Sequence, residues 1–130
     1  MHMILEHTYL NGETPAGNPY SDVVIAGDQL YISGLVALDF ESQEMRYGTI
    51  TEETKLVLDN LAVILEQYGS DMEHVIRADV LLADFSERDE MNEEYVRHFP
   101  KGHLPSRLCY GNVGLHGECR VEIAVIAAKK

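Results

Sequence analysis

The chain has 130 residues, a length that fits one domain built around a single hydrophobic core. Hydrophobic residues make up 45% of the chain and charged residues 25%, as expected for a soluble globular protein. Its 22 acidic residues outweigh 10 Lys and Arg and give a formal net charge of -12, which argues against binding to the phosphate backbone of nucleic acids.

Features that would indicate a membrane or an oxidising compartment are absent from the sequence. No apolar run approaches the roughly 20 residues of a membrane-spanning helix, and the first residues lack the pattern of a signal peptide. We therefore expect a cytoplasmic protein without a membrane partner, with Cys109 and Cys119 as reduced thiols. The histidines show neither HxH nor HExxH spacing, so no metal site is expected.

The first regular structure is predicted in the segment DVVIAGDQLYISGLVAL. Its two β-rich runs are separated by Gly27 and Asp28, which form a strong tight-turn signal. The pattern predicts a β-hairpin from about Asp22 to Ser33 and leaves open a continuation past Gly34. The polar stretch FESQEMRYG that follows is typical of a connection.

A long amphipathic helix is predicted after that connection. The segment TEETKLVLDNLAVILEQYG carries apolar residues at helical spacing, among them Val57, Leu61 and Ile64. Thr51 is the expected N-cap residue, and Gly69 is the expected residue just past the C-terminus of the helix.

A strand and a second helix are predicted next. Alternate residues of HVIRADVLLAD are expected to face the same side, namely Ile76, Ala78, Val80 and Leu82. The segment SERDEMNEEYVRHFP predicts a helix with Ser86 as its N-cap and Pro100 at its end. The expected buried stripe of this helix contains Met91, Tyr95 and Phe99.

The C-terminal segment PSRLCYGNVGLHGECRVEIAVIA predicts two strands joined by a turn. A symmetric hairpin would place Arg107 directly opposite Glu122, with Cys109 and Ala124 on the same face. Leu108, Tyr110, Val121 and Ile123 would then pack against the helices. Charges inside apolar strands are costly unless they are paired or used, so this pair indicates either a structural ion pair or a small-molecule site.

The order of these elements predicts one two-layer α+β domain over residues 1–130, a mixed sheet with two helices on one face. The strands are apolar on both of their faces, so the face without helices would also need a cover. We therefore expect a homo-oligomer.

Four segments in order resemble the signature blocks of the YjgF/YER057c/UK114 family, also called the Rid family, over residues 18–127. They are NPYSDVV…LYISG, TEETKLVLDNL, DEMNEEYVRHFP and PSRLCY…VEIAVIA. The resemblance implies a chorismate-mutase-like subunit that forms a homotrimer with sites between subunits. It also implies, for the RidA branch, hydrolysis of reactive 2-imino or 2-enamino acids such as 2-iminopropanoate and 2-iminobutanoate to 2-oxo acids and ammonia. That reaction requires no metal and no organic cofactor.

The resemblance assigns catalytic roles to three residues. Arg107 matches the arginine that binds the substrate carboxylate, and a planar guanidinium suits that task better than an ammonium. Glu122 matches the acid that orients or activates water. Tyr20 matches a tyrosine that lines the cleft, although packing at an interface would also explain it.

Four further residues match positions that contact ligand or lie at the cleft, namely Ser33, Gly34, Cys109 and Asn92. Gly34 and Cys109 are expected to act through their backbone N–H groups. Each of the side chains has a structural alternative. Ser33 could satisfy the backbone at a strand end, Cys109 could be a small buried residue, and Asn92 could be a helix-surface residue.

This chain departs from the family pattern at positions around the expected cleft. Asn18 stands where Gly is common, and Asp22 and Leu35 stand where Gln is common. Ala124 replaces a frequent second acid. These departures put the identity of the substrate in doubt more than the fold.

Three other functions compete with imine hydrolysis. The chain could bind small carboxylic metabolites without turnover, with Arg107 as the clamp, or it could act on a different imine. Some members of the family carry ribonuclease or translation-inhibitor names, but the charge of -12 argues against an RNA partner here.

Overall fold

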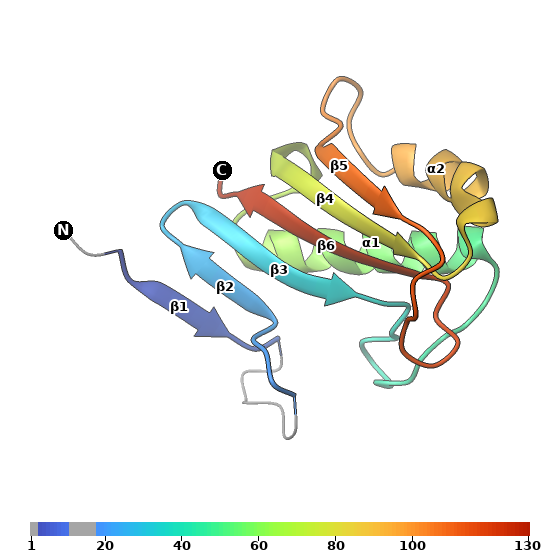
Figure 1. Ribbon diagram of the computed structural model, residues 1–130. Coiled ribbons are helices and arrows are strands. Elements are labelled where there is room, and N and C mark those ends of the chain that lie inside the picture. Colours follow the sequence, from blue (N-terminus) through green and yellow to red (C-terminus); the bar gives the residue numbers. More distant parts are fainter. Residues whose placement is uncertain (1–2, 11–17) are drawn as a thin grey trace.

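A computed structural model describes residues 3–10 and 18–130 of the chain (Figure 1). Its strands are β1 (Leu5–Thr8), β2 (Val23–Ala26), β3 (Gln29–Leu35), β4 (Val75–Leu82), β5 (Ser106–Tyr110) and β6 (Val121–Ala128). Its α-helices are α1 (Ile50–Gln67) and α2 (Arg88–Val96), and short 3-10 turns span Met72–His74 and Phe85–Glu87. No helix within the described ranges is both long and apolar enough to cross a membrane.

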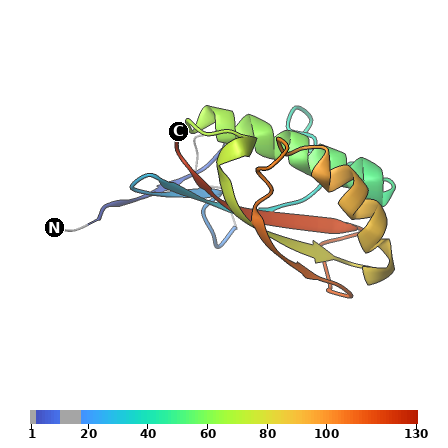
Figure 2. The same cartoon turned by 90° about the horizontal axis from the view of Figure 1, so that it is seen from above.

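The six strands form one mixed sheet in the order β1-β2-β3-β6-β4-β5. Every neighbouring pair is antiparallel except β4 and β5, which run parallel. Both helices lie on the same face of the sheet, and no helix of residues 3–10 and 18–130 lies on the opposite face (Figure 2). The predicted α+β fold with two helices on one face is therefore confirmed.

The predicted first hairpin is confirmed as β2 and β3. Gly27 adopts a φ of +59° at the turn, a conformation that favours glycine. Strand β3 ends at Leu35, so the continuation past Gly34 that the sequence left open is present. Strand β1, which the sequence pattern did not indicate, pairs with β2 at the edge of the sheet.

Helix α1 begins two residues earlier than the sequence pattern predicted, because a capping box is formed by Thr49 and Glu52. The Thr49 hydroxyl oxygen accepts a hydrogen bond from the Glu52 N–H at 3.1 Å, and the Glu52 carboxylate accepts one from the Thr49 N–H at 2.9 Å. The assignment of Thr51 as N-cap was therefore wrong. Gly69 follows the helix with a φ of +80°, so its predicted place past the C-terminus is confirmed.

Strand β4 contains an irregularity that changes which residue faces the helices. Its pairing with β6 shifts between Val75 and Arg77. As a result Val75 is buried while Ile76 is 44% exposed. The expectation that Ile76 shares a face with Ala78 was wrong, because a bulge breaks the two-residue alternation of the strand.

Helix α2 begins later than predicted. Asp84 caps the 3-10 turn before it, accepting a hydrogen bond from the Ser86 N–H at 2.9 Å, and the α-helix starts only at Arg88. Ser86 is therefore not the N-cap of α2. The predicted stripe is confirmed, since all three of its residues are buried, namely Met91, Tyr95 and Phe99.

The last two strands do not form a hairpin. β5 pairs with one side of β4, and β6 lies between β4 and β3 (Figure 1). Burial alternates regularly along strand β6, and its helix-facing residues are buried, namely Val121, Ile123, Val125 and Ala127. A central position buries this strand most completely, whereas pairing with β5 would move it toward the edge.

Candidate active site

Glu122 and Gly34 form the centre of one half of the candidate site. The pairing of β3 with β6 shifts its register between Ile32 and Leu35. Ser33 and Gly34 are the two residues of β3 that lie within this irregularity. The partly buried Glu122 side chain lies against Gly34 so closely that a Cβ at this glycine would overlap the carboxyl group. Only glycine therefore allows the carboxylate to occupy this position.

A cavity of about 540 Å³ surrounds this pair. Four of the predicted site residues line it, namely Tyr20, Ser33, Gly34 and Glu122. The remaining lining residues are Asn18, Val36 and His116. The sequence pattern did not single out His116 as a site residue, because a lone histidine in an irregular loop belongs to no motif.

Two side chains of this cavity have different structural surroundings. The Ser33 hydroxyl donates a hydrogen bond to the Ser21 carbonyl oxygen at 2.6 Å, so it fixes the backbone that precedes β2. This hydrogen bond agrees with the alternative interpretation of Ser33, in which its hydroxyl bonds to the backbone at a strand end. Tyr20, in contrast, is 52% exposed and its ring is available to a ligand or to another chain.

Arg107 forms the second half of the candidate site, beneath α2. Its Nη1 donates a hydrogen bond to Asn92 Oδ1 at 2.8 Å. Its guanidinium carbon lies 4.8 Å from the centre of the Tyr95 ring, within the range of a cation–π contact. Helix α2 therefore holds the guanidinium from two sides, and Asn92 is not a plain helix-surface residue.

The Tyr95 ring that supports Arg107 is deeply buried. Burial raises the pKa of the Tyr95 phenol to about 12, which extends the pH range over which the phenol stays neutral. Its hydroxyl is buried without a hydrogen-bond partner among the described residues. The ring thus presents a neutral aromatic face to the cation.

Cys109 lies two residues beyond Arg107 on β5 and is partly buried against the hydrophobic core. It pairs with Val80 of β4. Because β5 is the outermost strand, one side of its backbone has no partner strand in the described part of the chain. This edge is where the backbone of Cys109 could meet a ligand.

The structure does not bring the two halves together within one chain. Arg107 is opposite Ala78 of β4, whereas Glu122 is opposite Leu81 on the other side of that strand. Positions 78 and 81 differ by an odd number, so the two side chains leave opposite faces of the sheet. They are separated by about 10 Å along the strands and about 10 Å across them.

The predicted pairing of Arg107 with Glu122 was therefore wrong. It assumed that strands adjacent in sequence are adjacent in the sheet, and β4 lies between them. The alternative of a structural ion pair between these residues fails for the same reason. Leu108 and Tyr110, expected against the helices, lie on the other face and are 43% and 53% exposed.

The described residues contain no group of three or more His, Cys, Asp or Glu side chains that could hold a metal ion. The chemistry available to the two halves is that of a carboxylate beside a polar cavity and of a positioned guanidinium. These features define a two-layer α+β protein with a candidate site for a small carboxylate.

Comparison with known proteins identifies the family. The family model Endoribonuclease L-PSP matches residues 11–129. A Mus musculus protein named 2-iminobutanoate/2-iminopropanoate deaminase is 38% identical over 130 residues, covering 99% of this chain and 96% of that protein. The Saccharomyces cerevisiae protein named MMF1, mitochondrial is 31% identical over 116 residues, covering 89% of this chain and 79% of that protein.

A solved structure agrees with these relatives. A member of the YjgF protein family from Neisseria meningitidis superposes with a TM-score of 0.82 at 31% identity, covering 100% of this chain and 98% of that one. The chain belongs to the Endoribonuclease L-PSP family, which is the Rid or YjgF family that the sequence blocks indicated.

Proposed function

We propose that this protein hydrolyses reactive 2-imino acids, such as 2-iminopropanoate or 2-iminobutanoate, to 2-oxo acids and ammonia. The observation that carries the proposal is the placement of the Glu122 carboxylate against Gly34 at the wall of a cavity. The positioned Arg107 supplies a clamp for the substrate carboxylate. The name of the Mus musculus relative supports the same reaction.

The proposed site is assembled between subunits of a homotrimer. Arg107 and Glu122 leave opposite faces of one sheet, so a substrate that touches both needs a second chain. The helix-free face also carries exposed apolar side chains, including Tyr31, Leu108 and Tyr110. Covering this face with another subunit would bury them, which is a favourable contribution to assembly.

In the proposed mechanism, Arg107 binds the substrate carboxylate first. Asn92 accepts a hydrogen bond from Nη1, which uses one of the five N–H donors of the guanidinium. Its other N–H donors can therefore form two parallel hydrogen bonds with a carboxylate. This contact orients the adjacent C=N carbon toward the carboxylate of Glu122 from the neighbouring subunit.

Glu122 then acts as a general base toward one water molecule. The water oxygen attacks the imine carbon while Glu122 accepts its proton, and the C=N π electrons move to nitrogen. Return of this proton from Glu122 to nitrogen gives a carbinolamine with an NH2 group. Glu122 then transfers the proton of the new hydroxyl group to that nitrogen, so that the C=O bond forms as the C–N bond breaks, releasing the 2-oxo acid and ammonia. The substrate is already electrophilic, so positioning supplies much of the required rate enhancement.

A second candidate function is binding of small carboxylic metabolites without turnover. It is favoured by the Arg107 clamp, which α2 completes without any contribution from Glu122. RNA cleavage is disfavoured by the net charge of -12, because phosphate binding depends on Lys and Arg contacts. A cytoplasmic location stays a prediction.

The deciding experiment measures the decay of freshly generated 2-iminopropanoate with wild type, Arg107→Ala and Glu122→Gln at matched oligomeric state. The proposal requires acceleration by wild type and loss of that acceleration in both variants. If wild type does not exceed buffer but still binds pyruvate through Arg107, the binding function replaces it.

A further inference from the structure

The loop between β5 and β6, residues 111–120, brings one more titratable side chain to the cavity of Glu122. Figure 1 shows this loop at the end of the sheet where β3 ends and β6 begins. His116 lies in the loop and lines the same cavity of about 540 Å³ as Glu122. It is an exposed residue. A small substrate in this cavity can therefore contact both side chains.

The other described residues that line this cavity are poorly suited to exchange a proton with a substrate. They carry hydroxyl, amide or apolar side chains, or no side chain at all. The Ser33 hydroxyl donates its hydrogen bond to the Ser21 carbonyl oxygen at 2.6 Å. A phenol such as that of Tyr20 keeps its proton near neutral pH, whereas a histidine ring takes up and releases one there. His116 is therefore the lining residue that can complement the carboxylate of Glu122.

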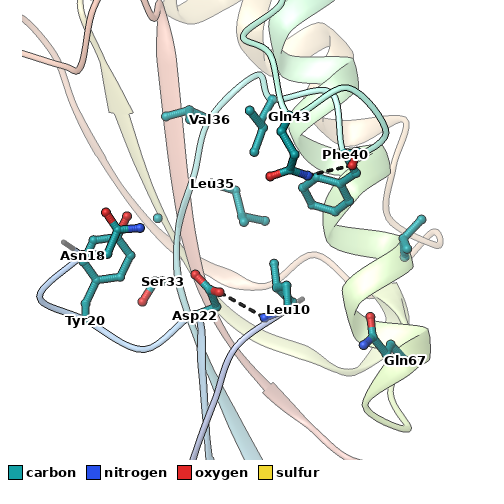
Figure 3. A pocket seen from close by; sticks show the side chains of 13 residues that line it. Leu10, Asn18, Tyr20, Asp22, Ser33, Leu35, Val36, Phe40, Gln43 and Gln67 are labelled. Atoms are coloured by element: carbon teal, nitrogen blue, oxygen red, sulfur yellow. Dashed lines mark hydrogen bonds between the residues drawn. The ribbon is translucent and has the colours of Figure 1, made fainter. Parts of the chain in front are cut away.

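The opposite side of β3 offers a substrate no such group. Figure 3 shows Tyr20 on one side of the end of β3, and Leu35 and Phe40 on the other side, toward α1. Leu35 and Phe40 line a second cavity of about 390 Å³, whose lining is largely apolar. Leu35 pairs with the buried, helix-facing Ile123, and the neighbouring Glu122 projects to the other face of the sheet. A substrate at Glu122 therefore faces the loop 111–120.

Hydrogen bonds at both ends hold this loop against the rest of the chain. After β5, the Val113 N–H donates to the Leu82 carbonyl oxygen at 3.1 Å. Before β6, the Arg120 N–H donates to the carboxylate of Glu53 at 2.9 Å. Glu53 is 1% exposed, so water does not compete for this bond. The two ends of the loop that carries His116 are thereby fixed to the sheet and to α1.

A tight turn fixes the backbone next to His116. The Cys119 N–H donates to the His116 carbonyl oxygen at 3.1 Å. Gly117 adopts a φ of +56°, and the Tyr47 hydroxyl lies so close to it that a Cβ would overlap the oxygen. Glycine meets both requirements. The imidazole therefore extends from a backbone of defined position, as a group that transfers protons requires.

The proposed hydrolysis needs a proton at the nitrogen when the C–N bond breaks. In the mechanism above, Glu122 serves the hydroxyl group and the nitrogen of the carbinolamine in turn. We propose that His116 is a second catalytic residue, the general acid that protonates the leaving nitrogen. His116 and Glu122 come from the same subunit, whereas Arg107 comes from its neighbour. This inference rests on the proposed imine hydrolysis and deepens it.

With His116 as the acid, both proton transfers of the cleavage step occur together. The His116 imidazolium gives a proton to the NH2 group while Glu122 takes the proton of the hydroxyl group. The electrons of the O–H bond form the C=O bond, and those of the C–N bond leave with nitrogen. The products are the 2-oxo acid and ammonia. Transfer of the proton from Glu122 to His116 through water restores both groups.

The first test compares two substitutions of exposed histidines. General acid catalysis contributes about 10²- to 10⁴-fold, so His116→Ala should lower kcat for 2-iminopropanoate about a hundredfold with little change in KM. His103→Ala is the matched control, because His103 lies in the loop before β5 and lines neither cavity. It should retain wild-type kcat. Wild-type kcat in His116→Ala, at matched oligomeric state, would overturn the inference and leave the proposed function standing. Absence of hydrolysis by wild type would overturn both.

Chemical rescue separates proton transfer from a structural role. Free imidazole should restore part of the lost kcat in His116→Ala, after subtraction of its effect on the uncatalysed reaction, and should not accelerate His103→Ala. His116→Gln keeps a polar side chain but cannot transfer the proton, so it should be as slow as His116→Ala. Failure of imidazole to accelerate His116→Ala would contradict a role in proton transfer.

A binding measurement distinguishes this role from binding of the substrate. Arg107 holds the carboxylate in the proposed mechanism, so calorimetric titration with pyruvate should give the same affinity for wild type and His116→Ala. Weaker binding of pyruvate by His116→Ala, with a raised KM and an unchanged kcat, would assign His116 to substrate binding. That result would overturn its assignment as the general acid.

Discussion

The carboxylate of Glu122 lies so close to Gly34 of β3 that no side chain fits at position 34. Gly34→Ala should therefore displace the carboxylate. Displacements of about 1 Å can cost about a hundredfold in rate, so we expect a fall in kcat/KM of this order toward 2-iminopropanoate.

The matched control is Gly114→Ala, since Gly114 has open space around it and lacks a positive φ. It should retain wild-type kcat/KM. Full activity in Gly34→Ala would mean that the position of Glu122 does not matter for the reaction.

Sharing of the site between subunits can be tested by mixing two inactive variants. Arg107→Ala and Glu122→Gln each spoil one half, and the halves of one chain face opposite ways. If each site takes Arg107 from one subunit and Glu122 from its neighbour, random equal mixing should restore about one quarter of wild-type activity. The measurement is imine hydrolysis after joint refolding. Absence of recovery in properly mixed oligomers would contradict a shared site.

Asn92 should act through Arg107 and affect binding more than chemistry. Its Oδ1 accepts the hydrogen bond from Arg107 Nη1 at 2.8 Å. Losing a hydrogen bond to a charged group costs about 1.5–3 kcal/mol, so Asn92→Ala should raise KM about tenfold or more. Glu93→Ala, on the exposed neighbouring position of α2, serves as the control. Steady-state kinetics of both variants would show whether the hydrogen bond orients the guanidinium.

Tyr95 should make stability sensitive to alkaline pH. Burial raises its pKa to about 12, while the phenol of an unfolded chain titrates near 10. Between these values the unfolded chain loses its proton first, so the free energy of unfolding should fall as pH rises. Tyr95→Phe should flatten that fall, as measured by urea unfolding from pH 9 to pH 12 at fixed protein concentration. An identical fall in the variant would assign it to other groups.

The N-terminus of α1 offers a test of the corrected cap. Thr49 forms the capping box with Glu52, whereas Thr51 is an exposed residue of the first turn. Thr49→Ala should lower the free energy of unfolding by about 1 kcal/mol. Thr51→Ala should change it much less. Urea unfolding of the two variants compares them directly, and the reverse order would contradict the observed cap.

Local patterns in the sequence were sufficient for several elements. The turn at Gly27, the buried stripe through Met91 and Tyr95, and the glycine after α1 all depend on residues close together in the chain. Errors at helix starts had local causes as well. Two threonines stood near the start of α1, and only the reciprocal hydrogen bonds with Glu52 distinguish Thr49 from Thr51.

Placement of the candidate site required the tertiary structure. The residue types were indicated by resemblance, but their partners were not. In the structure Arg107 contacts Asn92 and Tyr95, and Glu122 contacts Gly34. The predicted hairpin had instead paired Arg107 with Glu122. Which strands become neighbours depends on how well each possible order buries their apolar faces. This depends on all the strands together, so local sequence patterns do not predict it.

The sequence by itself determined the acidic charge, the family, and the types of both α-helices and of every strand except β1, because periodicity, turn residues and ordered blocks are properties of the linear chain. Only the tertiary structure decided that β4 separates Arg107 from Glu122, that Ile76 leaves the core at a bulge, and that an apolar hollow adjoins Gly34. These features arise from pairing and packing between segments that are distant in sequence. The strand order that buries the most apolar surface overall determines how deeply each strand is buried.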